Sequence, residues 1–344
     1  MASTAFATSI SVAQAEISVI ASIKPVHSLV AGVMKGVGSP NIIVDGAGSP
    51  HSYSLKPSQA KELQEANAVF WFGRDLETFL EKPIEALSSN ANVVKLLDTD
   101  GLLKLEFREG GPFSEHDHDD HDDHDDHKDH DDHDDHDDHD DHKDHDDHDD
   151  HKDHDDHGDE EALAYDPHSW LDPVAFKAQA SFVLEELKKA YPDLADTFQS
   201  NADAFMMSLD KIDTEYKAAF GDGGTCAKNS VAANHNAYAY IAYRYDIEFV
   251  TVHGLDPEGE PSAADIAKVV EKIGEDEIGV LFVEEYTDVT AVNSIVDQTK
   301  SSTMPDGVSV LTLYTMELPP KDSNDDYLSL MQKNLDNLKT GLSC

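Results

Sequence analysis

The residues most suited to chemistry are concentrated in a tract from residue 116 to residue 157, which contains 15 His, 24 Asp, 3 Lys and no other residue type. Imidazole binds zinc, copper and nickel, and the carboxylates beside it add oxygen donors and negative charge. Lacking apolar side chains, the tract cannot bury enough surface to order itself. We predict a disordered loop that binds several metal ions weakly, the alternative being a solvated acidic tether. Its candidate ligands are His116, His118, His121, His124, His127, His130, His133, His136, His139, His142, His145, His148, His151, His154 and His157.

Five further histidines lie outside the tract. Three of them, His51, His168 and His235, fall in loops at or beyond the expected ends of strands, which is where open α/β sheets bind ligands. Taken singly, each could be a structural histidine; the case for ligands is that all three occupy comparable loop positions. His27 follows Lys-Pro on a helical pattern and is expected to pack or face solvent. His253 ends a strand, so we expect it to be a neighbour of the site and not a ligand.

The elements that must position these loops alternate between strand and helix, which predicts parallel sheets flanked by helices. In the first half the predicted strands are 17–23, 41–44, 68–72 and 92–97, and the predicted helices are 24–34, 56–66 (with Ser54 as its N-cap) and 76–87. After the tract, helices 173–190 and 192–220 precede a second alternating set. Its strands are 230–233, 248–252, 279–284 and 309–314, and its helices are 238–243, 262–275, 289–300 and 324–339.

This order predicts two α/β lobes joined by one long rigid helix. The expected organisation is a signal remnant at 1–15, a first lobe at 16–190 that includes the tract, a linking helix at 191–221 and a second lobe at 222–344. The apolar periodicity of the linking helix extends over about 29 residues, or roughly 43 Å at 1.5 Å per residue.

Charge and cysteine content restrict the partners and the compartment. The formal net charge is −46, which argues against nucleic acid and anionic membranes and favours cations or a basic protein surface as partners. Residues 1–15 are small and uncharged and end in Ala-Gln-Ala, a pattern typical of the end of a secretory signal, although the positive region that should precede it is missing. In an oxidising compartment Cys226 and Cys344 could pair; the alternative is two free thiols.

Five motifs resemble the metal-specific solute-binding proteins of bacterial ABC uptake systems. They are Ser-Pro-His-x-Tyr-Ser-Leu-Lys-Pro-Ser around His51, Asp-Pro-His-x-Trp-Leu-Asp-Pro around His168, Asn-His-x-Ala-Tyr around His235, Ser-Ile-Lys-Pro at 22–25, and Gly-Leu-x-Pro-x-x-Glu-Pro-Ser at 254–262. The resemblance covers residues 17 to the C-terminus. It is closest to the zinc branch, which has three His ligands and often a His/Asp-rich insertion before the second of them.

The resemblance implies a metal site between the two lobes, with His51, His168 and His235 as ligands. Three imidazoles with one oxygen ligand suit tetrahedral Zn²⁺, whereas the harder Mn²⁺ favours more carboxylates. Family members with a fourth, aspartate ligand carry it in the loop that matches 284–288, so Asp288 is the best match; Glu284, Glu285 or water are the alternatives. Asp166, Trp170 and Asp172 are expected to shape the loop around His168. Asn234 and Asn236 could hold the second ring nitrogen of His235.

The resemblance therefore implies an exported, periplasmic protein that binds one Zn²⁺ tightly and delivers it to the membrane permease of an ABC transporter. We expect a monomer. The alternatives are a zinc buffer or chaperone that serves no permease, and a manganese or iron binder. A zinc hydrolase would also use three His and an exchangeable position, but the sequence has no His-Glu-x-x-His and no Gly-x-Ser-x-Gly. We therefore predict that the protein is not an enzyme.

Overall fold

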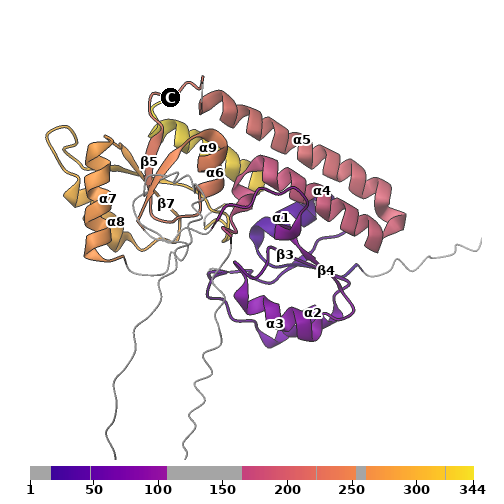
Figure 1. Cartoon of the computed structure of the whole chain (residues 1–344). Coiled ribbons are helices and arrows are strands. Elements are labelled where there is room, and N and C mark those ends of the chain that lie inside the picture. Colours follow the sequence, from indigo (N-terminus) through magenta and orange to yellow (C-terminus); the bar gives the residue numbers. More distant parts are fainter. Residues whose placement is uncertain (1–16, 47, 107–164, 222, 253–260, 322) are drawn as a thin grey trace, which may run out of the picture. The chain divides into compact units, whose positions relative to one another are not determined.

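The fold is built on two parallel sheets of four strands each (Figure 1). The structure is a computed structural model, and it describes residues 17–46, 48–106, 165–221, 223–252, 261–321 and 323–344. The predicted signal remnant, the His/Asp tract and His253 lie outside these residues. Within them, no helix is both long enough and apolar enough to span a bilayer.

The first sheet has the strand order β2-β1-β3-β4, with every neighbouring pair parallel. Its strands are β1 (Val19–Ala21), β2 (Asn41–Ile42), β3 (Ala68–Trp71) and β4 (Asn92–Lys95). Every residue of β1 and β3 is buried, as expected for central strands with helices on both faces. The helices of this lobe are α1 (Lys24–Val33), α2 (Pro57–Glu65) and α3 (Thr78–Leu87). In Figure 1, α2 and α3 lie together on one side of β3 and β4, and α1 lies on the other.

The second sheet repeats the same design, with the order β6-β5-β7-β8 and parallel pairing throughout. Its strands are β5 (Ser230–Ala233), β6 (Glu248–Thr251), β7 (Val280–Val283) and β8 (Ser309–Thr312). Its helices are α6 (Ala239–Tyr245), α7 (Ala263–Glu275), α8 (Val289–Gln298) and α9 (Tyr327–Gly341). The carboxyl ends of the strands in each sheet lie at one edge, so the loops that follow them come together.

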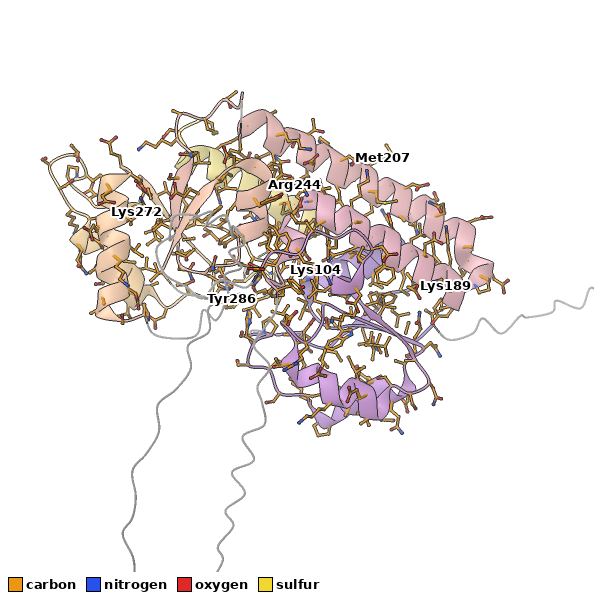
Figure 2. All side chains as sticks on the ribbon, in the orientation of Figure 1. Lys104, Lys189, Met207, Arg244, Lys272 and Tyr286 are labelled. Atoms are coloured by element: carbon orange, nitrogen blue, oxygen red, sulfur yellow. A yellow bond between two sulfur atoms is a disulfide. The ribbon has the colours of Figure 1, made fainter. Side chains whose placement is uncertain are left out.

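Two antiparallel helices, α4 (Pro173–Ala190) and α5 (Ala195–Ala219), connect the lobes. Near its middle α5 packs so closely on α1 that a Cβ at Gly32 would lie 3.1 Å from the Phe205 ring. Near its end the Tyr216 hydroxyl donates to the carbonyl of Met331 in α9, 2.9 Å away. The outer face of α5 is exposed, as Met207 shows in Figure 2.

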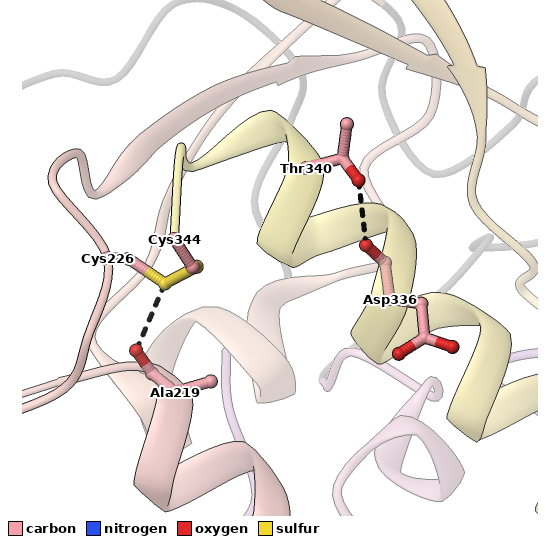
Figure 3. The surroundings of a disulfide bond; sticks show 5 residues. All are labelled: Ala219, Cys226, Asp336, Thr340 and Cys344. Carbon is pink, nitrogen blue, oxygen red and sulfur yellow. Dashed lines mark hydrogen bonds between the residues drawn. A yellow bond between two sulfur atoms is a disulfide. The ribbon is translucent and has the colours of Figure 1, made fainter.

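A disulfide between Cys226 and Cys344 ties the C-terminus to the segment that follows α5 (Figure 3). The sulfur of Cys226 also contacts the carbonyl oxygen of Ala219 at the end of α5. The two cysteines are 118 positions apart in the sequence, so the bond closes a loop that contains the whole second sheet.

The predicted fold class is confirmed, and β5 and α4 have the predicted bounds. Two local predictions were wrong. The linking helix does not begin at Pro192, because residues Pro192–Leu194 form a separate 3₁₀ turn and α5 has 25 residues. Proline fixes its φ angle and has no N–H, which favours a break between helices here. Ser54 does not cap α2; the N-cap is Lys56, whose N–H donates to the Gln59 side chain.

Candidate metal centre

Four side chains from four different loops converge on one point: His51, His168, His235 and Glu317. His51 lies between β2 and α2, and His168 immediately precedes the 3₁₀ turn Ser169–Leu171 that leads into α4. His235 lies just beyond β5, and Glu317 lies in the loop beyond β8. The site is thus assembled from segments that precede and follow the linking helix.

Each of the four residues offers one ligand atom, and these atoms all lie within 4.8 Å of one another. The centroids of the three imidazole rings are 5.3 Å apart for His168–His235, 6.0 Å for His51–His168 and 6.1 Å for His51–His235. Donor atoms about 2.0–2.1 Å from a tetrahedral zinc are roughly 3.3 Å apart. A small contraction of the group would therefore give zinc coordination.

His168 is completely buried between two carboxylates. Its Nδ1 lies 2.9 Å from Asp166 Oδ1, and its Nε2 lies 2.9 Å from Glu317 Oε1. Burial lowers the pKa of the imidazole, but the two carboxylates outweigh that effect and raise the pKa to about 10. In the metal-free protein His168 is therefore a cation at neutral pH, and a metal ion must displace its proton.

His235 is also buried, and its Nδ1 lies 2.6 Å from Glu284 Oε1. Burial lowers the pKa of His235, but Glu284 and then Glu317 raise it, and the net shift is upward. The other oxygen of Glu284 accepts a hydrogen bond from Thr315 Oγ1 at 3.0 Å. Asn234 braces the same loop, since its side-chain oxygen accepts from the Glu284 N–H.

Glu317 and His51 complete the group. Glu317 is 3 % exposed, and this burial raises the pKa of its carboxyl. Hydrogen bonding to His168 and the proximity of His51 outweigh burial, so the pKa is held well below its usual range. His51 Nε2 lies 3.4 Å from Glu317 Oε2 and makes no hydrogen bond to any residue that the structure describes. An imidazole nitrogen that is buried beside a carboxylate without a hydrogen bond is well suited to bind a metal ion.

The three predicted histidine ligands are thus brought together, whereas Asp288 is not part of the group. Asp288 is the N-cap of α8, where its carboxylate accepts from the Thr290 N–H at 2.7 Å. Glu284 holds His235, and Glu285 accepts from the Lys321 N–H at 3.0 Å. His27 is half-buried on α1, where burial and then Lys24 lower its pKa.

Glu317 was not predicted. It lies in a stretch, Thr-Met-Glu-Leu-Pro-Pro, that has no metal-ligand spacing to another His or carboxylate. Its position three residues after the end of a predicted strand, 309–314, was the one available signal.

The fold and the site define a metal-binding protein with two α/β lobes. A family model described as "Zinc-uptake complex component A periplasmic" matches residues 19–341, and the chain belongs to this family.

Relatives named high-affinity zinc uptake system protein ZnuA are 42 % identical to the chain over the aligned residues. For the Brucella suis relative (biovar 1, strain 1330) the match spans 325 residues, 94 % of this chain and 91 % of the relative. For the Brucella abortus relative (strain 2308) it spans 321 residues, 93 % and 90 % of the two chains.

Solved structures share the fold at lower sequence identity. The Zn(II)-bound ZnuA-like domain of Streptococcus pneumoniae AdcA superposes with a TM-score of 0.68 at 21 % identity, covering 95 % of this chain and 99 % of that domain. A crystal structure of ZnuA gives 0.68 at 18 % identity, covering 94 % and 98 %. These matches confirm the two-lobed architecture.

Proposed function

We propose that this protein captures one Zn²⁺ in the periplasm through His51, His168, His235 and Glu317 and delivers it to the membrane permease of an ABC uptake system. The observation that carries the proposal is the convergence of three imidazoles and one carboxylate within 4.8 Å. The relatives named as high-affinity zinc uptake proteins support zinc as the ion.

The surroundings of the histidines support the same set of ligands. Asp166 and Glu284 each engage the Nδ1 of one imidazole, which would leave Nε2 of His168 and His235 to bind the metal. Carboxylates in this role fix the ring orientation and increase the basicity of the ligand nitrogen. Three imidazoles and one carboxylate are a ligand set that suits zinc.

The His/Asp tract would act as an accessory. We propose that it collects zinc at many weak sites, so that the selective site is supplied from a local reserve. The protein would act as a monomer and in transport, not in catalysis. A zinc chaperone with no permease would use the same site, and co-purification with a permease would separate the two roles.

Calorimetric titration with Zn²⁺ at neutral pH tests this proposal on the full chain and on a variant that lacks residues 116–157. We expect one tight site in both proteins and additional weak sites only in the full chain. His168→Ala should abolish the tight site and leave the weak ones. Loss of all zinc binding on deletion of 116–157 would refute the four-residue site and make the tract the functional element.

A further inference from the structure

A closed ring of three hydrogen bonds lies directly behind His168. The Tyr240 hydroxyl accepts from the Leu105 N–H at 3.3 Å and donates to the Asp166 carbonyl at 3.1 Å. The ring is closed by the Asp166 N–H, which donates to the Leu105 carbonyl at 2.9 Å. One hydroxyl of α6 thus sets the spacing of two backbone segments that are about sixty residues apart in the sequence.

Asp166 is the residue of this hydrogen-bonded ring that orients the His168 imidazole. Its Oδ1 accepts from the His168 backbone N–H at 2.8 Å and from the imidazole Nδ1 at 2.9 Å. Asp166 is 3 % exposed, and with its N–H, carbonyl and carboxylate all engaged it has little freedom to move. Any shift in its backbone would move the carboxylate and rotate the His168 ring.

Tyr240 is well placed to prevent such a shift. Its side chain is fully buried, and burial raises the pKa of the hydroxyl, so the proton that it donates to Asp166 is retained at all physiological pH values. Without the hydroxyl, the partly buried Leu105 N–H and the buried Asp166 carbonyl would each lose a hydrogen-bond partner. The backbone there would then relax toward other partners.

We propose that Tyr240 is a positioning residue for the metal centre: its hydroxyl fixes the Leu105–Asp166 pair, and through Asp166 it sets the orientation of the His168 imidazole. This inference rests on the proposed function, because it takes His168 as a zinc ligand. Removal of groups that hold a metal ligand typically costs 10- to 100-fold in affinity. Tyr240 acts one step further away, so we expect about a tenfold loss.

The same helix offers a matched control. Tyr245 is also buried on α6, and its hydroxyl donates to Asp213 Oδ1 at 3.1 Å, away from the Asp166 loop. Tyr240→Phe and Tyr245→Phe each remove one buried hydroxyl and one donated hydrogen bond. A general loss of packing or stability would affect both variants, whereas a positioning effect would be confined to Tyr240→Phe.

The test measures zinc affinity by chelator competition and the visible absorption of the Co²⁺-loaded protein, which reports ligand geometry. Tyr240→Phe should weaken zinc binding about tenfold and change the Co²⁺ spectrum. Tyr245→Phe should keep a zinc affinity within about twofold of the parent protein and an unchanged Co²⁺ spectrum. Equal effects in both variants, an unchanged spectrum in Tyr240→Phe, or failure of Tyr240→Phe alone to fold would overturn the proposal. If the parent protein itself binds no zinc tightly, the proposed function fails instead.

A double-mutant cycle with Asp166→Asn tests the route of the effect. If Tyr240 acts through Asp166, its substitution should cost clearly less in the Asp166→Asn background than in the parent. Strict additivity of the two losses would contradict that route.

Discussion

Glu317→Gln should weaken zinc binding by about two orders of magnitude, whereas Asp288→Asn should leave it unchanged. Both substitutions convert a carboxylate to an amide of the same size. Glu317 belongs to the four-residue group, while Asp288 caps α8 from an exposed position. Asparagine is as good an N-cap as aspartate, so the control should also keep its stability.

The magnitude follows from the number of ligands. Four-coordinate structural zinc sites contribute roughly 10–16 kcal/mol, so an equal share is about 3 kcal/mol per ligand. At 1.4 kcal/mol per factor of ten, this corresponds to a loss of more than about 100-fold. One effect opposes the loss. Glu317 helps to keep His168 protonated, so removing its charge makes the imidazole easier to deprotonate for zinc. We therefore expect a loss near 100-fold at pH 7, with the deficit growing as the pH rises.

Competition against a chelator of known zinc affinity measures both variants, with the tract deleted so that weak sites do not contribute. A loss in Asp288→Asn with none in Glu317→Gln would refute the geometric argument and make Asp288 the ligand. No loss in either variant would leave water as the fourth ligand.

Further predictions concern the charge of His168, one ion pair and the disulfide. Zinc binding at pH 7 should release protons and strengthen as the pH rises, because the His168 pKa is raised to about 10; calorimetry in buffers of different ionisation enthalpy measures this, and a lack of buffer dependence would contradict it. The raised pKa also means that ionised His168 stabilises the metal-free fold fully below about pH 6.5, and that this stabilisation is lost as the pH rises through about 10. Arg244→Ala should lower the free energy of unfolding in urea by about 2–3 kcal/mol, because it removes the cation beside the buried Asp172 carboxylate. This is less than for a fully buried pair, because the Arg244 side chain is 26 % exposed. As a control, Lys177→Ala breaks an exposed pair with Asp210 and should cost under about 1 kcal/mol. Cys344→Ser should cost about 2–4 kcal/mol by the same measurement and leave zinc affinity intact; a change in affinity would show that the disulfide acts on the site.

The sheets could be predicted from the sequence because their strands are short, apolar and separated by amphipathic helices. Each predicted strand contains an observed one, and Ser230–Ala233 was exact. The ends of helices were harder to predict where they depend on a single hydrogen bond. The N-cap of α2 depends on the Gln59 side chain folding back onto Lys56, and the sequence pattern favoured Ser54 instead.

The three histidines could be predicted as candidate ligands because they lie in loops of the kind that bind ligands in open α/β sheets, and because the motifs around them resemble a known family. The carboxylate was harder to identify because the chain has 71 Asp and Glu residues, and many of them lie in loops. What distinguishes Glu317 is burial beside His51 and His168, which depends on how the loop after β8 packs against the His168 loop. The Trp170 indole N–H donates to the Thr315 carbonyl at 2.7 Å and holds these two loops together.

The same contacts would explain how the proposed zinc site is selective in so acidic a protein. Most of the carboxylates that the structure describes are exposed, where they bind cations weakly and without preference. At the metal centre, Glu317 is buried against imidazoles that are themselves held by Asp166 and Glu284. A divalent ion that displaces the protons of these imidazoles would balance the buried negative charge. The three imidazoles favour zinc over harder ions. In the proposed function, selectivity would therefore depend on burial and on the orientation of the nitrogen ligands, and not on the total charge of the chain.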